Sequence, residues 1–165
     1  MKTTKKVLIV DDDIDVITVL ETILKKEGYT VISANDKVEG KKLALAERPD
    51  LAILDVMMTT HYEGFELAKD LIEDPKLAGM KVLMQSSIDL ITTTNSSVQA
   101  MAREYRKDPS YRELQVLLIK DILSNNAGVD YRAENGESIW LPVDGFLRKP
   151  VDAARLLPEI NRVLS

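Results

Sequence analysis

The chain contains no cysteine, so neither disulfide bonds nor thiolate chemistry can contribute to its fold or function. It also lacks a hydrophobic run long enough to span a bilayer, and the N-terminal lysines precede only four apolar residues, too few for a signal peptide. An excess of basic residues is absent as well, because the formal net charge is -5. These absences predict a cytoplasmic protein that binds neither nucleic acid directly nor membranes.

The composition and length are those of an ordered globular domain. Hydrophobic residues make up 45% and charged residues 30% of the 165 residues, which is far from the signature of disorder. A chain of this length fits one hydrophobic core. We therefore expect a single domain over residues 1–165.

Strand and helix patterns alternate along the chain. The segment 51–55, LAILD, has no polar alternation, as expected of a strand buried on both faces of a parallel sheet. The pattern predicts strands at 7–10, 29–34, 51–55, 81–87 and 144–150, and helices at 14–24, 37–47, 64–74 and 152–165. This order predicts an α/β fold with a doubly wound parallel sheet, whose ligand site lies beyond the carboxyl ends of the strands.

Three adjacent carboxylates, Asp11, Asp12 and Asp13, follow the first predicted strand, and Asp55 ends the third. Like charges this close repel and require a compensating cation or proton. Asp11, Asp12 and Asp55 together would form the oxygen site that Mg²⁺ prefers. The alternatives are that Asp11 or Asp13 caps the next helix and that Asp55 is a loop or capping residue.

Two further polar residues are expected at the same edge of the sheet. Lys149 lies at the end of the last predicted strand and could bind a phosphate, although a lone surface lysine would indicate no function. Ser86 ends the fourth strand and would add a hydroxyl donor, although serine there is more often a turn former. The combination of carboxylates, hydroxyl and lysine at four strand ends indicates a functional site.

The motifs VLIVDDD, PDLAILDVMM, GFEL, KVLMQSS and DGFLRKP occur in this order. With them the sequence resembles the receiver domain of two-component response regulators. The resemblance implies a flavodoxin-like five-stranded parallel sheet of order 2-1-3-4-5. It covers most of residues 5–88 and 143–165.

The resemblance also implies a role for each acidic residue. Asp55 would accept a phosphoryl group, and Asp12 and Asp55 would ligate Mg²⁺ together with the backbone carbonyl of Met57. Asp11 would hold a metal-bound water. Such transfers are catalysed mainly by positioning and electrostatics, and a carboxylate can be the nucleophile.

Four other residues take roles from the same resemblance. Lys149 would pair with the phosphoryl oxygens, and Ser86 would turn toward them after transfer. Phe146 would change rotamer together with Ser86, and Pro150 would follow a cis peptide bond. Ser86 and Phe146 would thus form the switch.

The loop after Asp55 departs from the family pattern. Thr59 stands where the family usually has a proline, and one extra residue precedes Gly64. His61, the only histidine, lies in this loop. We interpret it as an exposed loop residue rather than a ligand or phosphoryl carrier.

The segment between Ser86 and Lys149 is longer than the family pattern requires. Their residue numbers differ by 63, whereas a helix with two loops needs about 20 to 25 residues, so roughly 40 are extra. We predict an insertion over 89–142 with one helix at 97–108, a second helix at 110–128 and a β-hairpin turning at Asn135–Gly136. We expect it to be folded, with Trp140 packing it onto the domain.

The leading hypothesis is a stand-alone phosphoacceptor switch rather than a separate turnover enzyme. Its partners would be a sensor histidine kinase or phosphotransfer protein and a downstream protein, and the family's partner face could also form a homodimer. One alternative is an aspartate-nucleophile phosphatase of the haloacid dehalogenase type, with Asp11 and Asp13 as nucleophile and acid. Another is a receiver-like interaction module that is not phosphorylated.

Overall fold

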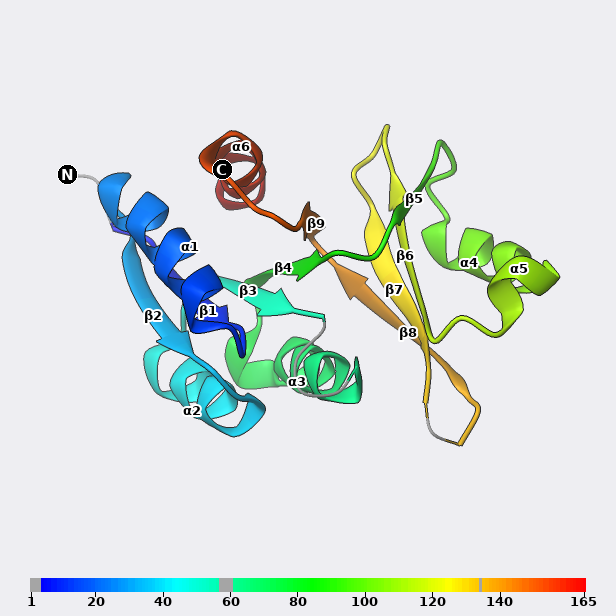
Figure 1. Ribbon diagram of the computed structural model, residues 1–165, viewed down its shortest axis with the longest axis horizontal. Helices are drawn as coiled ribbons and strands as arrows, with labels where there is room; N and C mark the ends of the chain where they lie inside the picture. Colours follow the sequence, from blue (N-terminus) through cyan, green and yellow to red (C-terminus); the bar gives the residue numbers. More distant parts are fainter. Residues whose placement is uncertain (1–3, 57–60, 134) are drawn as a thin grey trace. The chain divides into compact units, whose positions relative to one another are not determined.

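The computed structural model describes residues 4–56, 61–133 and 135–165, with the backbone alone described at 61 and 62. The chain divides into two compact units, both traced in Figure 1. We call residues 1–86 and 147–165 the main unit and residues 87–146 the inserted unit.

The main unit is built on a five-stranded sheet. Its strands are β1 (Lys6–Val10), β2 (Thr30–Ala34), β3 (Leu51–Asp55), β4 (Lys81–Ser86) and β9 (Gly145–Arg148). Their order is β2-β1-β3-β4-β9, and β1 runs parallel to β2 and β3, as β3 does to β4. The predicted parallel sheet of order 2-1-3-4-5 is confirmed, with β9 in the fifth place.

Helices cover both faces of this sheet. They are α1 (Ile14–Lys26), α2 (Lys37–Glu47), α3 (His61–Glu73) and α6 (Ala153–Leu164), with a 3₁₀ turn at Pro75–Leu77. Figure 1 shows α1 and α6 on one face and α2 and α3 on the other. Alternate residues of each strand therefore enter different cores: Val7 and Ile9 pack with α1 and α6, whereas Val10 lies against α2 at Gly40.

The two ends of α1 follow directly from local sequence. Asp13 is its N-cap, and its Oδ1 accepts the Asp15 amide at 2.9 Å. Gly28 follows the helix with φ of 91°, a conformation that favours glycine. The capping alternative is thus confirmed for Asp13, while Asp11 and Asp12 lie between β1 and the cap.

The inserted unit contains a mixed sheet of order β5-β6-β7-β8. Its elements are β5 (Leu90–Thr93), α4 (Val98–Arg106), α5 (Pro109–Arg112), β6 (Val116–Asp121), β7 (Ala127–Arg132) and β8 (Ser138–Val143). β5 is parallel to β6, and the pairs β6–β7 and β7–β8 are antiparallel. The predicted helix at 97–108 and the hairpin around Asn135–Gly136 are confirmed.

The predicted second helix at 110–128 is wrong. Only Pro109–Arg112 is helical there, and the apolar residues 116–119 form a strand buried at every position. A short continuous apolar run fits a buried strand as well as a helix, and here pairing with β5 and β7 decides for the strand. The strand β5 was not predicted, because its sequence LITT runs into a polar segment.

A ring contact and an ion pair add to the strand pairing that stabilises the inserted unit. The ring of Trp140 covers Gly128 so closely that a Cβ there would lie 2.2 Å from the ring, and Trp140 also packs on the cluster around Ala102 and Ile119. Arg106 of α4 forms a largely buried ion pair with Asp130 of β7 at 3.2 Å. The structure therefore places Trp140, which is partly buried, against the core of the inserted unit.

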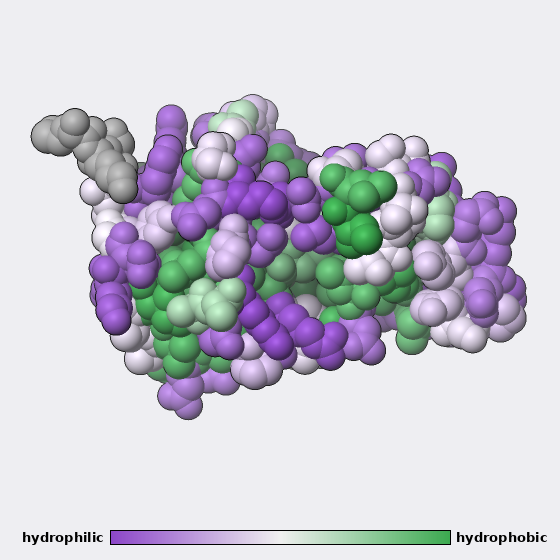
Figure 2. Space-filling model, turned by 90° about the horizontal axis from the view of Figure 1, so that it is seen from above, coloured by the Kyte–Doolittle hydropathy of each residue, from purple (hydrophilic) through white to green (hydrophobic). Residues whose placement is uncertain are grey.

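The surface is mixed in character. Among the residues whose side chains the structure describes, the large hydrophobic residues that are substantially exposed are Ile14, Val19, Val38, Leu114, Ile122 and Leu123. On the face drawn in Figure 2, hydrophobic residues reach the surface in separate groups between hydrophilic ones. Among the residues that the structure describes, no helix has the length and apolarity needed to cross a membrane.

Candidate functional site

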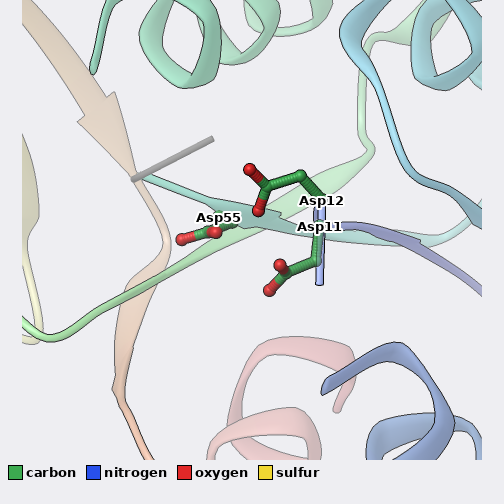
Figure 3. A group of neighbouring side chains, drawn as sticks. All are labelled: Asp11, Asp12 and Asp55. Carbon is green, nitrogen blue, oxygen red and sulfur yellow. The ribbon is translucent and has the colours of Figure 1, made fainter. Parts of the chain in front are cut away.

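Three carboxylates gather at one edge of the main sheet. Asp11 and Asp12 follow β1, and Asp55 ends β3, its parallel neighbour. One oxygen of each lies within 4.8 Å of the others, and Figure 3 shows the three side chains side by side. Asp11 and Asp55 are 0% and 1% exposed, whereas Asp12 is open to solvent. Two buried anions therefore share a site with one accessible anion.

Lys149 supplies the cation of this site. Its Nζ lies 3.1 Å from Oδ2 of Asp55 and 3.3 Å from Oδ2 of Asp11. Burial opposes the charged form, but the two carboxylates outweigh it and raise the pKa of Lys149. Its backbone N–H donates to the carbonyl of Ser86 at 2.9 Å, and the predicted cis bond before Pro150 is confirmed. The end of β4 thereby fixes the lysine backbone.

One lysine does not balance the carboxylates. Burial, aided by the charge of Asp55, raises the pKa of Asp11 to about 6, although the Asp13 amide and Lys149 act in the opposite direction. A divalent cation would remove this imbalance. The donors are hard carboxylate oxygens, one of them exposed to solvent, and such a set fits Mg²⁺, which binds a few carboxylates and keeps several waters.

The structure describes some of the other predicted site residues and not others. Ser86 is 2% exposed at the end of β4, next to the site. Phe146 is half-buried on β9. Met57 and Thr59 lie outside the described residues, and the side chain of His61 is not described either. The switch role of Phe146 and the metal contact of Met57 stay predictions.

Gln85 is a residue of this site that sequence reasoning missed. It lies in β4 directly opposite Asp55 and is 0% exposed. Its Nε2 donates to Oδ2 of Asp11 at 2.9 Å. The available signal was a single amide at the end of the otherwise apolar run VLM, since a buried polar side chain needs a partner.

Gly64 sets the distance between α3 and the site. A Cβ at this position would lie 2.6 Å from the backbone oxygens of both Asp55 and Val56. Only glycine allows the first turn of α3 to approach the end of β3 so closely. The GFEL motif therefore has a packing reason in addition to its family resemblance.

Comparison with known proteins places the chain among signalling domains. The family model described as response regulator receiver domain matches residues 7–118. A segment of 67 residues is 45% identical to the alkaline phosphatase synthesis transcriptional regulatory protein PhoP of Bacillus subtilis, covering 41% of this chain and 28% of that protein. A segment of 79 residues is 35% identical to the DNA-binding dual master transcriptional regulator RpaA of Synechocystis, covering 48% and 32%. The matches thus span less than a third of these relatives.

Solved receiver structures share the fold. The chemotaxis response regulator CheY4 of Vibrio cholerae, crystallised at low pH, superposes with a TM-score of 0.60 at 25% identity, covering 98% of this chain and 100% of that one. A CheY-like receiver domain protein of Methanospirillum hungatei gives a TM-score of 0.59 at 24% identity, covering 98% and 94%. The family match ends at residue 118, so β9 and Lys149 are assigned to the site by the structure. The chain belongs to the response regulator receiver family, the signalling modules of two-component systems.

Proposed function

We propose that the chain is a phosphoacceptor switch in which Asp55 receives a phosphoryl group. The observation that carries the proposal is the pairing of Asp55 with Lys149 at 3.1 Å inside a cluster of three carboxylates. A carboxylate held beside a fixed cation can act as nucleophile while the cation neutralises the charge that develops on the transferring group.

The proposed reaction forms one bond and breaks one. A carboxylate oxygen of Asp55 attacks the phosphorus atom of the donor, the bond from phosphorus to the donor breaks, and the donor group leaves with the electron pair. The product is an acyl phosphate. Lys149 then pairs with the phosphoryl oxygens, and Ser86 donates its hydroxyl to them.

Magnesium binding is part of the proposal. Asp12 and Asp55 would ligate the ion with the carbonyl of Met57, and Asp11 would hold a water bound to it. The ion would neutralise charge on the transferring phosphoryl group. Ser86 and Phe146 would then report the phosphorylated state.

The position of Asp13 supports a receiver over the phosphatase alternative. A haloacid dehalogenase-type site would need Asp13 beside Asp11 as the acid. Instead, Asp13 is exposed and its Oδ1 caps α1. The same alternative would also leave the pairing of Lys149 with Asp55 without a role.

The output would be carried by a partner protein. A histidine kinase or a phosphotransfer protein would supply the phosphoryl group in the cytoplasm, and the switch would act on a downstream protein. Receiver domains are phosphorylated by histidine kinases as a family, and that relation supports the first of these partners.

Intact-mass measurement tests the proposal. The wild type, Asp55→Asn and Asp11→Asn are incubated with Mg²⁺ and a small phosphodonor. A labile single phosphoryl adduct that is lost in Asp55→Asn supports the switch. Continuous donor hydrolysis that depends on Asp11 would support the phosphatase, and absence of both would leave the interaction module.

A further inference from the structure

We propose that Gln85 is a positioning residue that holds Asp11 in the orientation in which it serves the Mg²⁺ site. The inference rests on the proposed phosphoacceptor function, because that function supplies the reason for a cation at these carboxylates. It adds a residue that neither the sequence motifs nor the family match assign.

Each carboxylate oxygen of Asp11 accepts a hydrogen bond in the part of the chain that the structure describes. Oδ1 accepts the backbone N–H of Asp13 at 2.9 Å, and Oδ2 accepts Nε2 of Gln85 at 2.9 Å. An ionised carboxylate only accepts hydrogen bonds, so the amide of Gln85 must present its nitrogen. Each oxygen of Asp11 is thereby oriented by one uncharged donor.

Gln85 differs in kind from the other side chain at Oδ2, which is Lys149 at 3.3 Å. Lys149 also contacts Asp55 and will follow the charge when a phosphoryl group is added there. Gln85 carries no charge, so it neither competes with a metal cation nor moves toward an anion. It is the side-chain donor that can keep Asp11 in place in both states of the switch.

Packing alone gives no reason for an amide at position 85. Its Oε1 is buried and has no hydrogen-bond partner within the described ranges. A buried carbonyl left without a partner destabilises the fold, and an apolar side chain of similar size would avoid that cost. The Oε1 atom of Gln85 is therefore unfavourable for stability, whereas its Nε2 atom binds Asp11. This combination is expected of a residue kept for function rather than for packing.

The test compares Gln85→Met with wild type in Mg²⁺ titrations by calorimetry and in thermal unfolding with EDTA. Met keeps the length of the side chain and removes both polar atoms. We expect Mg²⁺ affinity to fall roughly tenfold, as for other groups that orient metal-binding side chains. The melting temperature in EDTA should change little, because losing the bond to Asp11 and removing the unpartnered Oε1 have opposite effects on stability. Met84→Leu, a change at the adjacent buried position of β4, serves as the matched control and should leave the affinity unchanged.

A double-mutant cycle shows whether Gln85 acts through Asp11. In the Asp11→Asn background, Gln85→Met should change Mg²⁺ affinity less than twofold, because the group it orients has lost its charge. Equal affinity of Gln85→Met and wild type, or an equal loss in both backgrounds, would overturn the inference alone. A wild type that binds no Mg²⁺ would overturn the proposed metal site and this inference together.

Discussion

The ammonium group of Lys149 lies 3.1 Å from Oδ2 of Asp55, although Asp55 ends β3 and Lys149 follows β9, the last strand of the main sheet. The same nitrogen lies 3.3 Å from Asp11. The lysine therefore lies between the two buried carboxylates and offsets part of their charge.

Replacing Lys149 with alanine should separate metal binding from phosphoryl transfer. Because Lys149 competes with a cation for the carboxylates, Lys149→Ala should bind Mg²⁺ as tightly as wild type or more tightly, yet form the phosphoryl adduct at least about tenfold more slowly. Asp12→Ala removes a proposed ligand and should weaken Mg²⁺ binding by about tenfold or more. Calorimetry and intact-mass time courses measure both effects. An equal loss of Mg²⁺ affinity in the two variants would contradict these roles.

Asp11 should make the stability of the metal-free protein depend on pH. Its pKa is raised to about 6 by burial, so the folded state binds the proton more tightly than the unfolded state does. The resulting stabilisation is fully present below about pH 3.9, the ordinary pKa of aspartate, and is lost as the pH rises through about 6.

Asp11→Asn should therefore stabilise the metal-free protein at pH 7.5 by up to about 2 kcal/mol and by little at pH 4. Denaturant unfolding in EDTA at both pH values measures the difference. Asp12→Asn, at an exposed position, is the matched control and should show a smaller effect. A gain for Asp11→Asn that does not change with pH would refute the assignment.

Gly64→Ala should destabilise the main unit and loosen the site. The added Cβ would meet two backbone oxygens at 2.6 Å, and backbone cannot move aside as a side chain can, so a cost of about 1 to 3 kcal/mol is expected. Gly40→Ala is the matched control within α2, because there the Cβ would meet side chains of Val10 and Leu67 at 3.0 to 3.3 Å. Thermal unfolding of both variants measures the contrast. Equal melting temperatures for the two would show that α3 is free to shift.

Removing Arg106 should unfold the inserted unit selectively. The guanidinium pairs with Asp130 and also donates to the carbonyl of Tyr111 at 2.9 Å, while its side chain is only 11% exposed. Losing one partner of a buried ion pair costs about 3 to 5 kcal/mol. Hydrogen exchange over residues 87–146 should therefore accelerate in Arg106→Ala and stay unchanged in Gln99→Ala, an exposed and uncharged position of the same helix. Similar protection in both variants would mean that the ion pair is dispensable.

The main sheet could be predicted from the sequence because its strands are short and largely apolar runs, and because α1, α3 and α6 have clear amphipathic patterns. Asp11, Asp55, Ser86 and Lys149 could be placed together for a related reason, since parallel strands bring their carboxyl ends to one edge. The positions of these four site residues thus follow from the local sequence pattern and from the topology of the sheet.

The parts that could not be predicted depend on contacts between distant residues. Residues 116–121 fit a helix by spacing, and only their pairing with β5 and β7 makes them a strand. Gln85 has no motif of its own, because its role comes from Asp11, a residue 74 positions away across the sheet. Periodicity cannot show which buried amide faces which carboxylate.

The central claim is that Asp55 carries the phosphoryl group, and borohydride reduction followed by peptide mass mapping tests it most directly. Wild-type protein is incubated with Mg²⁺ and a small phosphodonor and then reduced, which converts an acyl phosphate into an alcohol. The account predicts that residue 55 alone acquires the mass of homoserine and that no peptide does so when the donor is omitted. Reduction at Asp11, Asp12 or Asp13 instead, or at none of the carboxylates, would contradict it.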